Sequence, residues 1–389
     1  MRILRVIPSM NPKGGGPCQG IRNAVPEMQK INVSNDVVCF DDINDAFIAK
    51  DSFTIYALGK SKSPWSYNNK LIPWLQKNAS KYDIIIIHGL WLYHSYATIK
   101  FILNYRKSTE KSPKVYVMPH GMLDPYFQQS KERKLKAWRN SIYWKLVENK
   151  VINSADGILF TCEEELILAR TTFPNYKPKK EINVGYGVQT PPTYKESMKN
   201  TFMATVPQWN HKPFILFLSR IHHKKGVDLL IKAYLKLEKE LENLPQLIIA
   251  GPVDHPYGKE MQNLASSSKN ILFTGMLSGE AKWGAFYESE VFALPSHQEN
   301  FGIAVVEALA SSTPVLISNK VNIWREIKEG NAGIISEDNL HDTILMLKNW
   351  LSNSIMEKEQ MNKNAYSVFD NKFTITKAVL QFTTKLKNA

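Results

Sequence analysis

Short apolar runs alternate with longer amphipathic stretches through most of this chain. Such alternation is typical of parallel strands joined by crossover helices, so the sequence predicts an α/β fold. The predicted strands are ILRVIPS, DVVCF, FTIYALG, DIIIIHG, KVYVMPHG, GILFTC and INVGYGV in the first half, then FILFLSR, QLIIAG, NILFTG, VFALPS, PVLIS and AGIIS in the second. The run DIIIIHG is continuously apolar rather than alternating, which indicates a strand buried on both faces.

A polar segment from about Thr190 to Lys212 separates the two sets of strands and has the composition of a linker. A chain of 389 residues is also too long for one ordinary core, because single cores stop growing near about 250 to 300 residues. We therefore expect two doubly wound, Rossmann-like domains, residues 1–195 and 196–370, that face each other across a cleft. A final segment, 371–389, has an amphipathic pattern that permits it to cross back to the first domain. Ligands of such sheets bind at the carboxyl ends of the strands.

Composition and cysteine content narrow the class of protein. Apolar residues at 43% and charged residues at 22% are those of a globular protein. The three cysteines, Cys18, Cys39 and Cys162, are far apart and show no zinc-ligand spacing, which favours a reduced, cytoplasmic protein. Pro8 and Pro12 interrupt the first apolar run, which reads as a strand and not as a signal peptide. No apolar stretch approaches the roughly 20 residues needed to cross a bilayer.

The net charge of +13 favours an anionic partner: a phosphate-bearing ligand, an anionic lipid surface or nucleic acid. No base-reading module accompanies the charge, so nucleic acid is set aside. Much of the charge lies in the segment 131–150, where cations are interleaved with Trp138, Tyr143 and Trp144. The cations are Lys131, Arg133, Lys134, Lys136, Arg139, Lys145 and Lys150. Two interpretations stay open: a helix that lies on an anionic membrane and collects a lipid-linked acceptor, or one whose aromatic side packs on its own domain while its cations extend into solvent.

One predicted strand of the second half ends in Ser219 and Arg220, and a basic loop leads from there to Lys225 and Gly226 before a helix begins. A guanidinium can bind two phosphate oxygens at once and an ammonium acts as a mobile point charge, so Arg220 and Lys225 suit a diphosphate. If the diphosphate is a leaving group, the same charges stabilise the charge that develops on it. Taken alone, the segment could equally be a solvated basic loop.

A second loop carries Glu299 and turns into a helix that bears Glu307. The turn and the start of the helix comprise Asn300, Phe301, Gly302 and Ile303. Gly302 permits close approach of the backbone, and the free amides of a helix N-terminus form an anion site. Carboxylates beside a phosphate need another purpose, and hydroxyl groups are suitable partners. Glu307 can accept hydrogen bonds from a ribose, and Glu299 from a transferred sugar.

Together these segments resemble the retaining glycosyltransferases of the GT-B fold, and specifically glycosyltransferase family 4, or glycosyl transferases group 1. Members of that family show two acidic residues separated by seven others, here Glu299 and Glu307. They also show a strand-end arginine with a downstream Lys-Gly pair, here Arg220, Lys225 and Gly226. The resemblance covers nearly the whole chain.

The resemblance implies further site residues. The glycine-rich segment PKGGGP, with Gly15 and Gly16, would lie against the diphosphate of the sugar donor, and a plain turn is its alternative. His120, which follows a predicted strand, would face the transferred sugar, and a satisfied core histidine is its alternative. Backbone atoms near Gly251 and Met276 would read the base.

As the resemblance implies, the protein would transfer a sugar from a UDP- or GDP-sugar to a glycan or lipid-linked acceptor in cell-surface polysaccharide biosynthesis. The anomeric configuration would be retained without an enzyme nucleophile. Arg220, Lys225 and the amides after Glu299 would neutralise the diphosphate, so we expect no metal and no other cofactor. Glu299 and His120 would bind the sugar, and Glu307 the ribose.

Two other functions stay open. A nucleotide-sugar epimerase or hydrolase of the same fold would need a water-activating or proton-abstracting pair, and no further constellation of that kind is visible. A non-catalytic, sugar-nucleotide-binding scaffold is the second alternative. Loss of the charged residues Arg220, Lys225, Glu299 or Glu307 would have favoured it, and all four are present.

Overall fold

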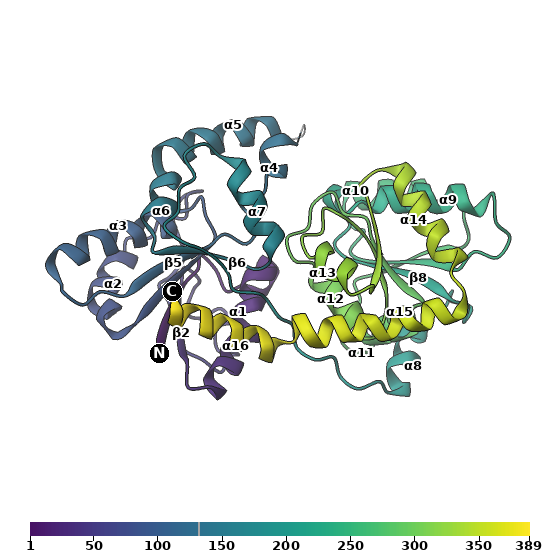
Figure 1. Ribbon diagram of the computed structural model, residues 1–389, viewed down its shortest axis with the longest axis horizontal. Coiled ribbons are helices and arrows are strands. Elements are labelled where there is room, and N and C mark those ends of the chain that lie inside the picture. The colour runs from purple at the N-terminus through teal and green to yellow at the C-terminus, as the bar shows by residue number, and fades with distance from the viewer. Residues whose placement is uncertain (131–132) are drawn as a thin grey trace. The chain divides into compact units, whose positions relative to one another are not determined.

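A computed structural model of the chain describes residues 1–130 and 133–389. The chain forms two compact units, residues 1–187 together with 375–389, and residues 188–374 (Figure 1). Residues 188–195 and 371–374, which we expected outside the second domain, fold with the second unit. Each unit is built on one parallel sheet, as the alternation of strands and helices predicted.

The first unit contains a seven-stranded sheet in the order β3-β2-β1-β4-β5-β6-β7. Its strands are β1 (Arg2–Val6), β2 (Ser34–Cys39), β3 (Ile55–Ala57), β4 (Ile84–His88), β5 (Lys114–Met118), β6 (Gly157–Phe160) and β7 (Glu181–Asn183). Its α-helices are α1 (Gly16–Lys30), α2 (Leu71–Asn78), α3 (Tyr93–Ser108), α4 (Tyr126–Gln129), α5 (Lys134–Tyr143), α6 (Asn149–Ser154), α7 (Glu163–Thr172) and α16 (Ile375–Asn388).

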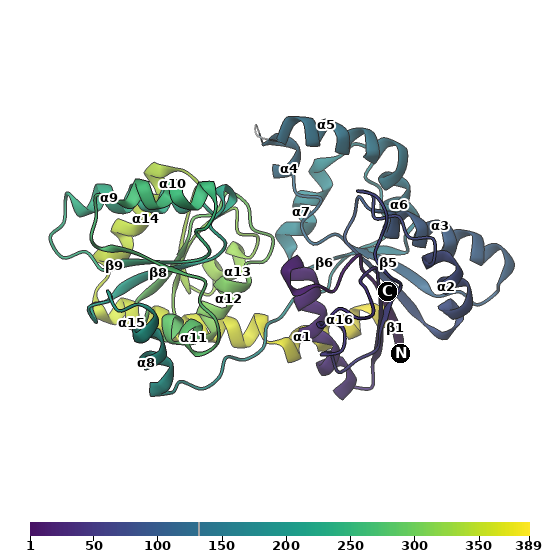
Figure 2. The same cartoon turned by 180° about the vertical axis from the view of Figure 1, so that it is seen from behind.

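Strand β4 shows why the first sheet is covered on both faces. Ile85 and Ile87 point into one core, which they share with α2 and α3, whereas Ile84 and Ile86 point into the other. The continuously apolar run therefore predicted a strand buried on both sides correctly. The second core is closed by α16, whose apolar residues recur on one face of the helix, and Figure 2 shows α16 beside α1. The residues that α16 contributes are Ile375, Val379, Phe382 and Leu386.

The second unit contains a six-stranded sheet in the order β10-β9-β8-β11-β12-β13. Its strands are β8 (Phe214–Leu218), β9 (Gln246–Ala250), β10 (Ile271–Gly275), β11 (Val291–Leu294), β12 (Val315–Ser318) and β13 (Gly333–Ser336). Its α-helices are α8 (Glu196–Thr205), α9 (Val227–Glu238), α10 (Pro256–Ala265), α11 (Gly279–Glu288), α12 (Ile303–Ala310), α13 (Trp324–Glu329), α14 (Leu340–Ser352) and α15 (Ile355–Val368). Every strand that the sequence predicted is present in one of the two sheets.

Both sheets reverse their strand order at one place. The chain runs outward from β1 through β2 to β3 and then returns to place β4 on the other side of β1. In the second unit it runs from β8 through β9 to β10 and returns to place β11 beside β8. The loops that follow the two strands at such a switch point diverge and leave a crevice at their carboxyl ends. The charged candidate residues of the second unit follow β8 and β11, whereas Gly251 and Met276 follow β9 and β10; those of the first unit follow β1 and β5.

The described part of the chain contains no helix that combines the length and the apolar character needed to traverse a bilayer.

Candidate functional site

The loops after β8 and β11 are joined directly at the switch point of the second sheet. A short 3-10 turn (His223–Lys225) ends at Gly226, whose φ is 63°. A Cβ atom at Gly226 would lie 1.9 Å from the carbonyl oxygen of Pro295, so glycine is required where α9 begins against the end of β11. The carbonyl of Lys224 accepts a hydrogen bond from the N–H of His297 at 2.7 Å. The basic loop is therefore part of a fixed structure.

Lys225 and Glu299 form an ion pair between these two loops. The side chains are only 11% and 20% exposed, respectively. The backbone on each side of Glu299 is also held, because its N–H donates to the carbonyl of Lys320 at 2.9 Å and its carbonyl accepts from the N–H of Asn322 at 3.0 Å. A cation and a carboxylate are thus positioned together at the carboxyl ends of β8 and β11.

The start of α12 supplies free backbone amides beside this ion pair. Its N-cap, Gly302, has a φ of 76° and offers no side chain to cap the first amides. A Cβ atom there would approach the Cγ of Glu299 to 3.3 Å. The ring of Phe301 is buried and packs edge-on against Phe373, with centroids 5.6 Å apart, so only its backbone is available to a ligand. The amides of α12 and the charge of Lys225 together form a potential anion site.

Glu307, one turn into α12, pairs with a residue that the sequence did not indicate. Nζ of Lys282, on α11, lies 2.9 Å from Oε1 of Glu307 and 4.2 Å from the ring centroid of Trp283. Neither side chain of this pair is fully buried. Lys282 fixes the position of the Glu307 carboxylate, whose oxygens can accept hydrogen bonds from hydroxyl groups.

The remaining predicted residues line the neighbouring strand ends. Arg220 is exposed and makes no hydrogen bond or ion pair with any described residue. Ser219 donates its N–H to the carbonyl of Ala250 at 3.0 Å, and a Cβ atom at Gly251 would lie 2.1 Å from the Ser219 carbonyl oxygen. Met276, just beyond β10, has 63% of its surface exposed. Ser219, Gly251 and Met276 therefore follow the ends of three adjacent strands.

His222 sits beside the cations of the basic loop. Its Nδ1 accepts a hydrogen bond from the backbone N–H of Lys224 at 3.1 Å. Burial, together with the positive charges of Lys224 and Arg220, lowers the pKa of the ring. The neutral imidazole is the form that can accept this bond, so His222 serves here as a cap for the basic turn.

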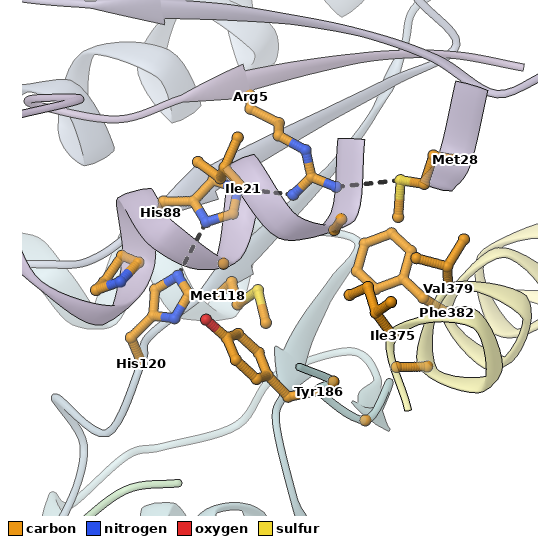
Figure 3. A pocket seen from close by; sticks show the side chains of 16 residues that line it. Arg5, Ile21, Met28, His88, Met118, His120, Tyr186, Ile375, Val379 and Phe382 are labelled. Carbon is orange, nitrogen blue, oxygen red and sulfur yellow. Dashed lines mark hydrogen bonds between the residues drawn. The ribbon is translucent and has the colours of Figure 1, made fainter. Parts of the chain in front are cut away.

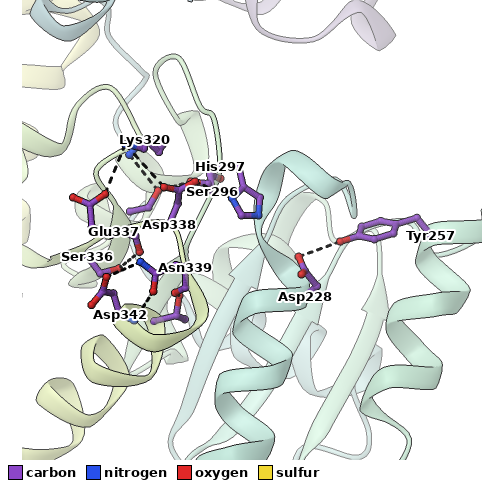
Figure 4. A network of polar contacts seen from close by, with 12 residues as sticks. Asp228, Tyr257, Ser296, His297, Lys320, Ser336, Glu337, Asp338, Asn339 and Asp342 are labelled. Atoms are coloured by element: carbon purple, nitrogen blue, oxygen red, sulfur yellow. Dashed lines mark hydrogen bonds and ion pairs between the residues drawn. The ribbon is translucent and has the colours of Figure 1, made fainter. Parts of the chain in front are cut away.

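A network of polar contacts connects the loop after β11 with the segments that follow β12 and β13 (Figure 4). Nδ1 of His297 lies 3.0 Å from Asp338, and Lys320 lies 3.7 Å from Glu337 and 4.0 Å from Asp338. Asn339 caps α14 by accepting the N–H of Asp342 at 3.0 Å. These contacts tie the ends of β12 and β13 to the loop after β11.

The other candidate residues belong to the first unit. Gly15 has a φ of 84°, and Gly16 begins α1, with no atom within 4 Å of a Cβ at either position. His120 follows β5 with a φ of 53°, in the left-handed region that side chains rarely adopt. Its Nε2 lies 2.9 Å from Nδ1 of His88, and both rings line a pocket together with Arg5 (Figure 3). The ligand roles of these residues stay predictions.

Among residues 1–130 and 133–389, no three His, Cys, Asp or Glu side chains gather closely enough to hold a metal ion. The expectation of a metal-independent reaction stays a prediction.

Comparison with known proteins finds a family match within the second unit. Residues 199–368 match the family described as glycosyl transferases group 1. An uncharacterized glycosyltransferase from Methanocaldococcus jannaschii is 30% identical over 137 residues, which are 35% of this chain and 35% of that protein. The alpha-monoglucosyldiacylglycerol synthase of Streptococcus pneumoniae is 28% identical over 174 residues, 42% of this chain and 38% of that protein. The matched segments span less than half the length of either relative.

A solved structure extends the likeness to the whole chain. The Anabaena protein HepE, in complex with UDP and glucose, superposes with a TM-score of 0.74 at 14% identity, and the match covers 100% of both chains. At this identity the likeness concerns the fold. The expected GT-B fold class, with two parallel α/β units, is confirmed.

Proposed function

We propose, from the glycosyl transferases group 1 domain formed by residues 199–368, that this protein is a retaining, metal-independent glycosyltransferase of family 4. It would use a UDP- or GDP-sugar and a glycan or lipid-linked acceptor in the biosynthesis of cell-surface polysaccharides. The observation that carries the proposal is the ion pair of Lys225 and Glu299 at the switch point of the second sheet. Cations and free amides that suit a diphosphate lie there together with carboxylates that can accept hydrogen bonds from sugar hydroxyls. A nucleotide diphosphate sugar requires this combination.

Each group of this site would bind one part of the sugar donor. Arg220, exposed and unpaired among the described residues, would bind the diphosphate with Lys225 and the amides of α12. Glu299 would accept hydrogen bonds from hydroxyls of the transferred sugar, and Glu307, held by Lys282, from the ribose. Ser219, Gly251 and Met276 would line the remaining nucleotide surface. In the first unit, Gly15, Gly16 and His120 would serve the diphosphate and the sugar.

The reaction then needs no side-chain nucleophile. The bond between the anomeric carbon and the diphosphate breaks, and the acceptor oxygen bonds to that carbon on the same face. The acceptor proton passes to an oxygen of the leaving diphosphate. Arg220 and Lys225 stabilise the negative charge that develops on this leaving group, which is the task a metal ion performs elsewhere.

A lipid-linked acceptor is supported by the surface of α5 and the helical turns after it. Four apolar side chains are exposed there at a spacing of three or four residues, which places them on one side of the helix. They are Leu135 at 85%, Trp138 at 68%, Ile142 at 41% and Leu146 at 64% exposure. The exposed cations beside them are Lys134, Lys136, Arg139, Lys145 and Lys150, whereas Lys131 lies outside the described residues. Apolar groups ringed by cations suit an anionic lipid surface.

The segment 133–150 combines features of both interpretations, a helix on a membrane surface and a helix packed on its own unit. Trp144 packs inward and stacks on Phe173 at 4.6 Å, and Tyr143 accepts a hydrogen bond from Trp65 at 2.6 Å. Only Trp138 of the three aromatic residues is mainly exposed. We propose that the outward stripe rests on the inner face of the cytoplasmic membrane while the inward side anchors the segment to its own unit. The three cysteines are free thiols, in keeping with a reducing compartment.

The proposal is tested by product analysis. Full-length protein is incubated with UDP-glucose, UDP-N-acetylglucosamine or GDP-mannose and with lipid-linked sugar acceptors, and nucleotide release and anomeric configuration are followed by NMR. We expect release that depends on the acceptor and a product that keeps the donor configuration. Release without an acceptor would indicate a hydrolase. Binding of a nucleotide sugar without any release would favour a scaffold.

A further inference from the structure

Arg5, near the end of β1, is a buried cation that pairs with no carboxylate among the described residues. Only 3% of its surface is exposed. Its guanidinium donates to Oδ1 of Asn35 at 2.9 Å and to Sδ of Met28 at 3.4 Å, and Nη1 lies 3.1 Å from Nε2 of His88 (Figure 3). Phe382 of α16 lies under the guanidinium at 5.5 Å. Burying a charge without an ionic partner costs free energy of folding. The contact of this charge with the imidazole of His88 therefore calls for a functional explanation.

The contact with Arg5 determines which nitrogen of His88 carries a proton. An arginine has only donors and stays protonated, so Nε2 of His88 must present its lone pair. The neutral ring then carries its proton on Nδ1. That nitrogen lies 2.9 Å from Nε2 of His120, which must therefore accept. The proton of a neutral His120 is consequently on Nδ1.

The backbone that carries each of the two rings is also held by hydrogen bonds. Nε2 of His94 on α3 lies 2.9 Å from the carbonyl oxygen of His88 and holds the end of β4. Glu165 on α7 accepts the N–H of Gly121 at 2.5 Å, which holds the backbone of His120 in its left-handed conformation. The rings of His88 and His120 stack with centroids 5.1 Å apart. This geometry leaves His120 little freedom to rotate.

We propose that Arg5 and His88 are positioning residues that hold His120 as an uncharged ring with its proton on Nδ1. His120 then presents a hydrogen-bond donor to its ligand, and acts neither as a general base nor as a cation. The inference rests on the proposed function for the identity of that ligand, a hydroxyl oxygen of the transferred sugar. The tautomer itself follows from the contacts of the first unit alone.

Burial and the neighbouring positive charge also favour the uncharged form of both rings. Burial, and then the positive charge of Arg5, lowers the pKa of His120 to about 3, and the same two causes lower that of His88 well below its usual value. Burial also lowers the pKa of His94 to about 4. Two further titratable side chains near the pocket are Tyr186, which lines it, and Cys18; burial raises the pKa of both. None of these groups changes its charge between pH 5 and pH 7.

Few polar side chains line the pocket around His88. Apart from Arg5, the two histidines and Tyr186, its lining is apolar or glycine. The hydroxyl of Tyr186 donates to the carbonyl of Gly16 at 3.0 Å. It packs into a notch at Gly20, where a Cβ atom would lie 2.1 Å from the hydroxyl oxygen. Arg5 is thus the group that sets the orientation of the hydrogen-bond chain.

The test is direct observation of the ring nitrogens. Full-length protein labelled with 15N-histidine is studied by proton-nitrogen correlation NMR between pH 5 and pH 8, without ligand, and the His120 signals are assigned by their loss in His120→Asn. We expect Nδ1 protonated, Nε2 unprotonated and no titration over this range. Protonation on Nε2, or titration of the ring within it, would overturn the proposal.

Two variants test the positioning residues. Arg5→Met removes the obligatory donor, so the His120 signals should become those of mixed tautomers. His88→Asn keeps an amide N–H that can donate to His120, so the tautomer should be largely retained. The rings of His211 and His341 in the second unit are internal references that neither change should move. An unaltered His120 tautomer in Arg5→Met, or its loss in His88→Asn alone, would contradict the assignment.

Activity supplies a separate readout. Per folded molecule, Arg5→Met should lower kcat about tenfold, the size of one hydrogen bond lost from the transition state, with little change in KM for the sugar donor. A purely structural role would reduce only the amount of folded protein. Because the NMR result needs no substrate, it stands or falls independently of the transferase assignment.

Discussion

Lys225 pairs with Glu299 although 74 positions separate them in the chain. The pair connects the loop after β8 to the loop after β11, and its members lie where the strand order of the second sheet reverses. Lys225 is therefore partly neutralised before any anion arrives, and the side chain of Glu299 is held in place. The site is preorganised for a ligand that combines negative charge with neutral hydroxyl groups.

The coupling between these two residues is measurable. Lys225→Met should lower the free energy of unfolding by about 1 to 3 kcal/mol, because it leaves a mostly buried carboxylate without its partner. Glu299→Gln should cost less, and the double variant less than the sum of the two. Urea unfolding of all four proteins gives the coupling energy. Strictly additive effects would show that the ion pair does not form in solution.

Arg220 should matter for turnover and not for stability. It is exposed and bonds to no described residue, so Arg220→Ala should change the free energy of unfolding by less than about 0.5 kcal/mol. If it stabilises the departing diphosphate, the same change should lower kcat by about 10²- to 10³-fold. Lys236→Ala, another exposed cation, is the matched control and should leave both quantities unchanged. Equal turnover for Arg220→Ala and wild type would remove Arg220 from the site.

The sequence predicted the strands and the loops after β8 and β11 because both signals are local. Parallel strands buried on two faces give continuous apolar runs, and the residues that follow them fall at the carboxyl edge of the sheet. Glu299 and Lys225 could be assigned to one site for that reason. Their ion pair and the partner of Glu307 could not, because Lys282 lies on α11 and its approach depends on how that helix packs.

In the first unit, too, the contacts between distant elements could not be predicted from the sequence. His120 was marked by its place after a strand, but its partner His88 and the cation Arg5 come from two other strands, β4 and β1. An arginine within a mainly apolar strand is a possible signal, yet its neighbours follow only from the strand order. Tertiary pairing, which short-range periodicity does not encode, completes this cluster.

Glu148 should give the first unit a distinctive pH dependence. Burial raises its pKa to about 8, against smaller opposing effects of Ser95 and the backbone of Trp91. Up to about pH 8 Glu148 stays protonated in the folded protein, whereas in the unfolded protein it ionises above about pH 4.5. The contribution of Glu148 to stability is therefore complete below pH 4.5 and is lost as the pH rises to about 8. Glu148→Gln should therefore stabilise the protein at pH 8, on the order of a few kcal/mol, and hardly at pH 4.5.

Thermal unfolding of wild type and Glu148→Gln at several pH values measures this difference. Glu110→Gln, an exposed acid in the same unit, is the control and should follow the wild type throughout. A difference between Glu148→Gln and wild type that does not grow with pH would contradict the raised pKa.

Vesicle flotation tests the exposed stripe on α5. The full-length protein should float with vesicles containing phosphatidylglycerol, bind purely phosphatidylcholine vesicles much less, and dissociate from the anionic vesicles as salt increases. Leu135→Glu combined with Trp138→Glu should abolish flotation. The control is Ile355→Glu with Met356→Glu, which charges two residues of the second unit that are 76% and 81% exposed. Equal flotation of both double variants would place lipid binding elsewhere.

The central claim is that the crevice beside Lys225, Glu299 and Glu307 binds the nucleotide diphosphate. We would measure thermal shifts of wild type, Glu307→Gln and the surface control Glu359→Gln with UDP, GDP and their analogues lacking the ribose hydroxyls. At about 100 times its dissociation constant, a nucleotide should add roughly 2.7 kcal/mol to the stability of the folded protein. The account predicts that wild type and Glu359→Gln prefer one intact nucleotide over its deoxygenated analogue, and that Glu307→Gln loses this preference. No shift with either nucleotide, or the same preference in Glu307→Gln, would contradict it.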